Sequence, residues 1–333
     1  MAVIPVRRLL LNMAWPMMLS MLIQALYNLV DSMFVAQLSS DGFVALALVY
    51  PIQTLMIAVC VGTGVGFNAL LARRLGEDRP DEANRVVANG YFVYLVCWVV
   101  FLVLGVGLAP VFMELFAPGQ PQVIDYGIQY LSIVTGASVG ICMQFAGERT
   151  LQATGNTVGP MVIQGIGAVI NLILDPLLIF GIGPFPRMEV AGAALATVLG
   201  QVVGMVVGLC MVRRSSIVRL SFRGFRPDSA IIRTMFRVGV PAILVQALAT
   251  VMNLGMNLIL PLFTASGVFI LGAYFKLQSF LFMPVNGLNN ALIPIVSFNY
   301  GARQRSRITG VIHFALVLSA AIMAVGPGVF LAI

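Results

Sequence analysis

Apolar stretches long enough to cross a lipid bilayer follow one another along the whole chain. A transmembrane helix needs about 20 mostly apolar residues. Hydrophobic residues make up 60% of this sequence and charged residues only 9%, a composition that is unusual for a soluble domain. We therefore predict an all-α polytopic membrane protein with about nine transmembrane helices. The expected spans are 13–38, 43–72, 86–113, 122–146, 158–182, 190–212, 238–263, 268–298 and 308–333.

The basic residues predict the orientation of these spans. If the N-terminus is cytoplasmic, every Lys and Arg except Arg187 and Lys276 falls in or beside a cytoplasmic loop. This is the positive-inside pattern. The longest such loop, 213–237, carries seven arginines, and a role in topology and in contact with anionic lipid explains them without nucleic acid. Arg7 and Arg8 precede the first span without an A-x-A cleavage pattern, so we expect that helix to be retained.

A weak internal repeat relates the two ends of the chain. One constant shift along the sequence superposes 16–76 on 241–301 without a gap. The identical pairs include Pro16/Pro241, Asn28/Asn253, Gln53/Gln278, Gly62/Gly287 and Gly76/Gly301. An even-numbered helical unit repeats in the same orientation, as in two-lobed transporters.

The repeat predicts how the chain is divided. We expect an N-terminal six-helix lobe at 1–212, an Arg-rich cytoplasmic linker at 213–237 and the first three helices of a C-terminal lobe at 238–333. Because Ile333 corresponds to Leu108 in the first unit, three more helices are expected to complete two pseudo-symmetric six-helix lobes. The chain is therefore interpreted as a shortened form of a twelve-helix architecture.

A carboxylate lies inside one of the apolar spans. Asn171 and Asp175 are four residues apart in 158–182, on the same helical face, and Pro176 leaves the carbonyl of Leu172 without its helical donor. An ionised carboxylate near the bilayer centre costs roughly 2.5–3.5 kcal/mol on insertion scales, so it is expected to face protein or water. Such oxygen ligands suit a small cation, and a polar helix–helix contact is the alternative.

Two further polar residues are expected at the same depth. Asp31, Asp175 and Thr197 each lie seven residues from the outer end of their spans, roughly 10 Å deep at 1.5 Å per residue. Two carboxylates close together in a low dielectric do not both ionise cheaply. We therefore predict a site for H⁺ or Na⁺ formed by Asp31, Asn171, Asp175 and Thr197, with a structural hydrogen-bonded cluster as the alternative.

Other polar residues within the spans are candidates for a substrate cavity. They are Gln24, Asn28, Gln164, Gln201, Gln246, Asn253, Asn257, Lys276 and Gln278. Lys276 either extends to the outer interface or lines the cavity as a base. Glu148 and Arg149 are expected at the inner end of their span, as an interfacial pair or cap. The four cysteines show no metal-ligand spacing, and neither HExxH nor a nucleophile–base pair is apparent, so no cofactor, no metal other than Na⁺ and no enzymatic activity is predicted.

Five segments resemble those of the multidrug and toxic compound extrusion (MATE) transporters. They are Gln24–Asp31, Gly155–Thr157, Asn171–Pro176, Gly192–Thr197 and Ser297–Ala302. The resemblance implies two six-helix lobes that form a V and alternate between outward-open and inward-open states. It also implies efflux of small organic, often cationic, compounds driven by H⁺ or Na⁺. Carried over to this chain, it assigns Asp31, Asn171, Asp175 and Thr197 to the cation site of the N-terminal lobe.

The resulting prediction is a secondary antiporter for organic cations. We expect a monomer in the plasma (inner) membrane of a bacterium or archaeon, with its N-terminus in the cytoplasm and no nucleic-acid partner. The alternative is a flippase for a lipid-linked precursor, which shares the two-lobe plan but calls for a more basic central cavity. A channel would need a continuous polar pore, whereas the polar residues here gather at one depth.

Overall fold

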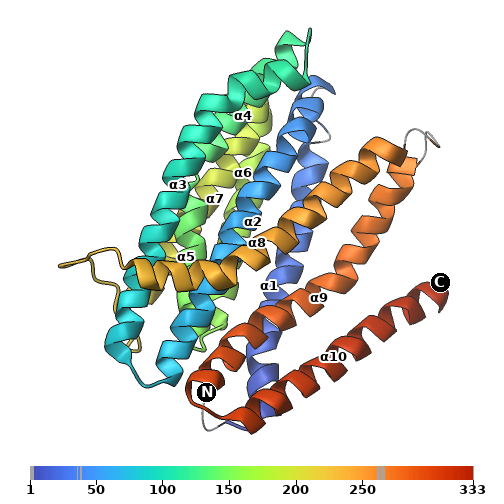
Figure 1. The fold of residues 1–333 in the computed structure, drawn as a ribbon. Coiled ribbons are helices and arrows are strands. Elements are labelled where there is room, and N and C mark those ends of the chain that lie inside the picture. Colours follow the sequence, from blue (N-terminus) through green and yellow to red (C-terminus); the bar gives the residue numbers. More distant parts are fainter. Residues whose placement is uncertain (1–3, 36, 38–39, 261–262, 264–266, 333) are drawn as a thin grey trace.

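The computed structural model describes residues 4–35, 37, 40–260, 263 and 267–332, and some side chains within the helices at 27–35, 40, 253–281 and 325–332 lie outside that description. Along these residues ten helices follow one another, drawn in Figure 1. They are α1 (Val6–Val35), α2 (Ser40–Gly76), α3 (Pro80–Phe116), α4 (Pro121–Gly136), α5 (Val139–Ala153), α6 (Val158–Phe180), α7 (Glu189–Arg213), α8 (Ser229–Ile259), α9 (Gly267–Gly301) and α10 (Arg305–Ala332).

The lengths and compositions of the helices confirm a polytopic membrane protein. Among the described residues, seven helices are long and apolar enough to cross a membrane, and α4 with α5 forms a further candidate span bent by 40°. The expected span 122–146 is therefore two helices rather than one. The span expected at 268–298 falls in α9, several of whose side chains lie outside the description. Helices suit this setting because each satisfies its own backbone hydrogen bonds in lipid.

The segment between the two halves of the chain is shorter than expected. α7 ends at Arg213 and α8 already begins at Ser229, so the residues 229–237 of the expected linker are helical. Asp228 caps α8, because its side chain accepts hydrogen bonds from the backbone N–H groups of Ala230 and Ile231. The linker is held against α3, where Asn84 Oδ1 accepts from the N–H of Arg219 at 2.7 Å.

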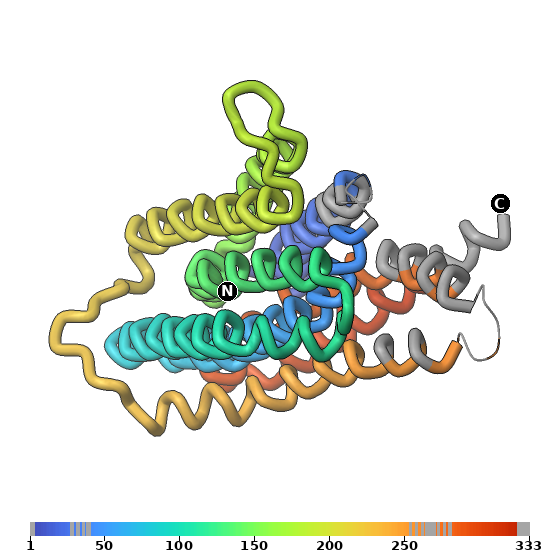
Figure 2. Tube along the Cα trace, turned by 90° about the horizontal axis from the view of Figure 1, so that it is seen from above, coloured from blue at the N-terminus to red at the C-terminus, as the bar shows by residue number. Residues whose placement is uncertain are grey.

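The two halves of the chain contact each other near one end of the bundle. Figure 1 shows α8, α9 and α10 diverging from α1–α7 toward the opposite end, and Figure 2 shows them on one side of the bundle when seen from above. α8 packs along α2. The first half of α1 packs against α9 and α10 in a buried cluster that includes Leu10, Met17, Leu288 and Ile295.

The turns at this end repeat each other. Asp78, after α2, and Arg303, after α9, both have φ of 57°, and the register that pairs Pro16 with Pro241 also pairs these two positions. The hydrogen bonds around them correspond residue by residue: Arg79 N–H donates to Arg74 O at 3.1 Å, and Gln304 N–H donates to Asn299 O at 2.9 Å. Both helices end in this way in a Schellman turn. The repeat seen in the sequence thus recurs in the backbone geometry.

Candidate functional site

Three of the predicted cation-site residues form a buried polar cluster between α6 and α7. Asn171 and Asp175 of α6 are 2% and 0% exposed, and Thr197 of α7 is 7% exposed. With the Asn171 amide nitrogen turned toward the carboxylate, it donates to Asp175 Oδ2 at 2.6 Å, and the amide oxygen accepts the N–H of Thr197 at 3.1 Å. In the other orientation the amide nitrogen reaches Thr197 Oγ1 at 3.4 Å. The cluster therefore joins a carboxylate, an amide and a hydroxyl.

Small residues bring the two helices close enough for these contacts. A Cβ added to Gly200 would lie 2.7 Å from the carbonyl oxygen of Gly167 and 3.3 Å from Cβ of Asn171. Only glycine allows α7 to approach α6 at this level, as is common where helices meet in membranes. The Gly200 backbone thus lies directly against Asn171.

The fourth predicted member of the cation site is on α1. The side chains of Asp31 and Asn28 lie outside the part of the chain that the structure describes. The approach of Asp31 to Asp175, and with it the four-residue site, stays a prediction.

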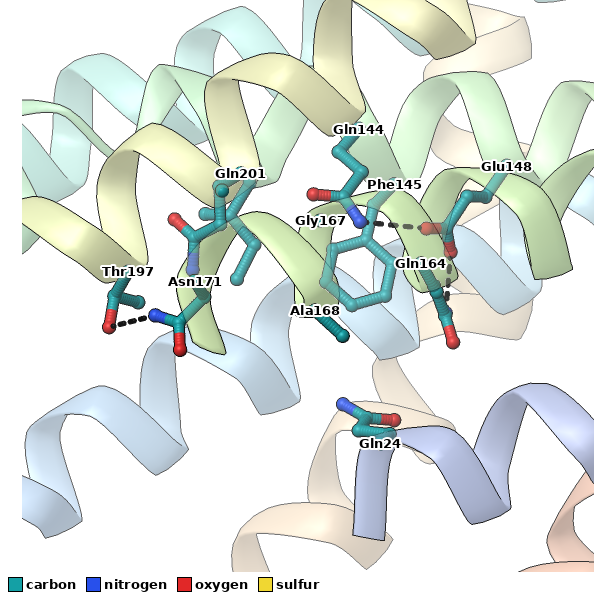
Figure 3. A pocket seen from close by; sticks show the side chains of 12 residues that line it. Gln24, Gln144, Phe145, Glu148, Gln164, Gly167, Ala168, Asn171, Thr197 and Gln201 are labelled. Atoms are coloured by element: carbon teal, nitrogen blue, oxygen red, sulfur yellow. Dashed lines mark hydrogen bonds between the residues drawn. The ribbon is translucent and has the colours of Figure 1, made fainter. Parts of the chain in front are cut away.

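A small cavity of about 110 Å³ lies beside the cluster. It is lined by residues of α1, α5, α6 and α7, among them the predicted residues Gln24, Gln164 and Gln201. Figure 3 shows Asn171, Thr197 and Gln201 at one end, Gln144, Glu148 and Gln164 at the other, and Gln24 on the opposite wall. The cavity therefore connects the buried cluster to a second acidic group.

That second acid is Glu148 of α5, which we expected at the membrane interface as part of a pair or cap. The expectation is wrong, because Glu148 is only 2% exposed. Its Oε1 accepts from Gln144 Nε2 at 3.0 Å and its Oε2 accepts from Gln164 Nε2 at 3.0 Å. Gln164 Oε1 in turn accepts from the hydroxyl of Ser20. Both oxygens of the buried carboxylate are thus held by neutral amides.

A larger cavity of about 620 Å³ lies between the two halves of the chain. Its lining residues come from α1, α2, α5 and α6 on one side and from α8 and α9 on the other. Gln24, Gln164 and Gln246 of the predicted substrate residues line it. Glu148 lines both cavities, so one carboxylate faces the interlobe space and the pocket next to Asp175.

Several lining residues of the interlobe cavity were missed in the sequence. Arg149 was counted in a cytoplasmic loop, yet it is 3% exposed and lines this cavity. Asn286, Asn289 and Asn290 of α9 also line it. The sequence pattern that could have identified them is the group of asparagines within the apolar span 268–298.

The remaining predicted substrate residues lie elsewhere or are not described. The side chains of Asn253, Asn257 and Lys276 lie outside the described residues. Gln278 is half-buried and is absent from the described linings of these two cavities. Their roles stay predictions.

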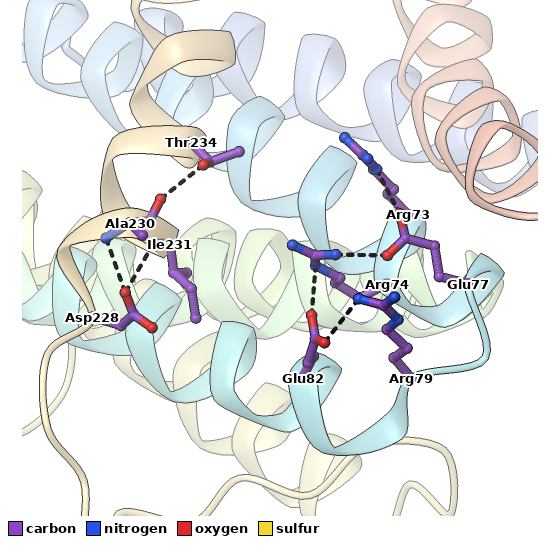
Figure 4. A network of polar contacts seen from close by, with 9 residues as sticks. All are labelled: Arg73, Arg74, Glu77, Arg79, Glu82, Asp228, Ala230, Ile231 and Thr234. Carbon is purple, nitrogen blue, oxygen red and sulfur yellow. Dashed lines mark hydrogen bonds and ion pairs between the residues drawn. The ribbon is translucent and has the colours of Figure 1, made fainter.

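A separate polar cluster surrounds the turn between α2 and α3 (Figure 4). Glu77 pairs with Arg73 at 2.8 Å and with Arg74 at 2.6 Å, and Arg74 also reaches Glu82 at 3.2 Å. Burial raises the pKa of Glu77, but the hydrogen bonds from Arg73 and Arg74 outweigh it and hold that pKa below its ordinary value of 4.5. The cluster fixes the turn at the end where the two halves of the chain meet.

Comparisons with known proteins agree with this architecture. A family model described as MatE matches residues 16–177 and 241–330, and the two ranges begin at the prolines that the internal repeat pairs. A protein of Shewanella oneidensis named FAD transporter is 30% identical over 308 residues, 91% of this chain and 67% of its own length. Multidrug export protein MepA of Staphylococcus haemolyticus is 24% identical, with 95% of this chain and 69% of that protein covered.

A solved structure is also similar. The crystal structure of MATE in complex with MaL6 matches with a TM-score of 0.88 and 25% identity, over 95% of this chain and 70% of that one. The chain thus spans about two thirds of the length of these relatives, and the similarity extends over nearly all of it.

Proposed function

This chain belongs to the MATE family of multidrug efflux transporters, and we propose that it works as a secondary antiporter that exports organic compounds in exchange for H⁺ or Na⁺. The observation that carries the proposal is the carboxylate of Asp175, which is fully buried and linked to Asn171 and Thr197 beside a cavity. A buried acid in a membrane helix is a functional feature more often than a structural one. No cofactor takes part in this proposal.

The chemistry of the cluster suits either coupling ion. A proton neutralises the carboxylate and removes the cost of burying its charge. Na⁺ prefers hard oxygen ligands, which the carboxylate of Asp175, the amide oxygen of Asn171 and the hydroxyl of Thr197 offer. In this proposal Asp31 adds the second carboxylate.

The lobe arrangement supports alternating access. With the N-terminus in the cytoplasm of a bacterium or archaeon, the contacts of α8 with α2 and of α9 with α1 lie toward the cytoplasmic side of the inner membrane. Ion binding at Asp31 and Asp175 then favours a state with lower affinity for the substrate, with Pro176 helping its helix to bend. The ion shifts the equilibrium only by its different affinity for the two states.

The substrates in this proposal occupy the interlobe cavity as single molecules in a monomeric transporter. Its volume of about 620 Å³ lies within the range of about 300–1,000 Å³ of small-molecule pockets. Organic cations would be held by the Glu148 carboxylate, which lines the cavity. A flavin dinucleotide is a second candidate, because the Shewanella oneidensis relative is named FAD transporter.

Reconstituted transport tests the function directly. Proteoliposomes that contain the chain are loaded with ethidium, and efflux is followed under an imposed pH gradient, an imposed Na⁺ gradient or neither. Efflux that one ion gradient accelerates and that stops when the gradient is collapsed is the expected result. Equal leakage under all conditions, matching protein-free liposomes, would sink the antiporter proposal.

A further inference from the structure

Arg149 is a buried positive charge in the wall of the interlobe cavity. The side chain is 3% exposed and lies on α5, in the half of the molecule that α2 and α6 also build. No ion pair of Arg149 with nitrogen–oxygen distance of 4.0 Å or less occurs among the described side chains. Moving a charge out of water into a protein interior without an ion-pair partner costs on the order of several kcal/mol, even after the surroundings relax. The Phe145 ring, 6.0 Å from the guanidinium carbon, offsets part of this cost, and an anion at the guanidinium would offset more.

The contacts of the guanidinium are all to neutral groups. Nη1 donates to Gln152 Oε1 at 2.9 Å and to Asn290 Oδ1 at 3.3 Å, and Nε has no hydrogen-bond partner among the described residues. The oxygen of Gln152 is also shared, because Asn68 Nδ2 donates to it at 3.1 Å. Arginine has five N–H donors. Its hydrogen-bonding capacity is therefore only partly used.

The acid next to Arg149 in the chain forms no ion pair with it within 4.0 Å. Glu148 is the adjacent residue, but successive helical residues point about 100° apart, and both of its oxygens accept from Gln144 and Gln164. The other polar side chains of the cavity wall are amides, from Gln24 on α1 to Asn286 and Asn289 on α9. The cavity wall thus carries a carboxylate and a guanidinium on adjacent residues, and the hydrogen bonds of each go to neutral amides.

We propose that Arg149, assisted by Asn290, is an anion-binding subsite that holds a phosphate or carboxylate group of the exported molecule. Arginine suits this role because its planar fork binds such groups with two parallel hydrogen bonds. The inference rests on the interlobe cavity being the substrate site, as proposed above. It makes the preferred substrates organic molecules with an anionic group, including those that also carry a cationic group for Glu148.

The hydrogen bond between Arg149 and Asn290 links anion binding to the relative position of α5 and α9. Arg149 belongs to α5 in the first lobe, and Asn290 belongs to α9 in the second. An anion held between them contacts both lobes and therefore responds to their separation. The subsite thus binds best in the arrangement in which the two residues are close.

Two ligands that differ by one phosphate test the subsite. Riboflavin 5′-phosphate and riboflavin are titrated into the purified chain in detergent, and binding is read from quenching of flavin fluorescence. We expect the phosphorylated flavin to bind at least about tenfold more tightly, the gain of a charge-assisted hydrogen bond pair. Arg149→Gln should weaken binding of the phosphorylated flavin far more than binding of riboflavin and so abolish this difference, whereas the exposed control Arg233→Gln should keep it.

The outcomes separate recognition of an anion from a structural role. Equal weakening of both flavins by Arg149→Gln, or no preference in the unchanged chain, overturns the proposal. If the glutamine variant does not fold, Arg149→Lys decides, because it keeps the charge and should retain part of the preference. A folded lysine variant without preference also overturns it. Ethidium efflux is measured in parallel: its absence defeats the antiporter proposal and leaves a phosphate preference standing as evidence for the subsite.

Discussion

Gly62 of α2 lies directly against the backbone of Ile243 of α8, where a Cβ on the glycine would be only 2.6 Å from the Ile243 nitrogen. A second contact is the counterpart of this one under the internal repeat. A Cβ on Gly287 of α9 would lie 2.8 Å from the nitrogen of Met18 on α1. The two halves of the chain thus meet through paired glycine contacts related by the repeat.

Replacement of Gly62 tests whether its close contact with Ile243 stabilises the packing of α2 against α8. In Gly62→Val the added side chain meets the Ile243 backbone, and overpacking of this kind costs about 1–3 kcal/mol. We expect a lower melting temperature in detergent and slower gradient-driven ethidium efflux. Gly107→Val on the exposed face of α3 is the control, because a Cβ there meets nothing within 4 Å. Equal effects of the two variants would contradict a role for the close approach.

Removal of charge at the two acids of the predicted cation site tests ion coupling. Asp175→Asn and Asp31→Asn should each abolish proton- or Na⁺-driven efflux, because the neutral amide neither releases a proton nor supplies a negative charge to a cation. Efflux is measured in proteoliposomes under imposed gradients. Asp125→Asn, an exposed acid on α4, should transport normally. Undiminished transport by the Asp175 variant would remove the cation site from the mechanism.

Glu148 is expected to select for positive charge in the substrate. Its carboxylate is buried, is held by Gln144 and Gln164, and faces both cavities. Glu148→Gln should weaken ethidium binding by at least about tenfold, the effect of one lost charge-assisted interaction. Riboflavin, which is neutral, should bind as before. The measurement is a fluorescence titration with both ligands, and equal loss for the two would instead indicate a structural role.

Glu77 should make the stability of the chain depend on pH. Its pKa in the folded chain is lowered, so its stabilising contribution is complete above the ordinary value of 4.5 and is lost as the pH falls through the lowered pKa. Glu77→Gln should therefore lower the melting temperature at neutral pH, and the difference should vanish in acid. The effect is small, about 0.2–1 kcal/mol for an exposed ion pair. Glu114→Gln, an exposed acid on α3, is the control, and a difference that persists in acid would contradict the ion-pair explanation.

The helices and the repeat could be predicted because their causes are local. A bilayer demands long apolar helices with satisfied backbones, so hydropathy alone located the spans. Glycine, proline and asparagine matched under one constant shift, and the same shift relates the turns at Asp78 and Arg303. The break between α4 and α5 was missed, because the apolar pattern continues across it. The start of α8 was also missed, because Arg233 and Arg237 are charged and were assigned to the cytoplasmic loop.

The sequence by itself determined that this chain is a helical membrane protein of repeated plan with acids and amides inside its spans. Only the tertiary structure decided that Asn171, Asp175 and Thr197 share one cluster, and that Glu148 and Arg149 line cavities instead of a membrane interface. The reason is physical: hydropathy reports the cost of moving a residue into lipid, whereas the bend between α4 and α5 and the packing between the lobes decide which side chains meet. Those contacts join residues far apart along the chain.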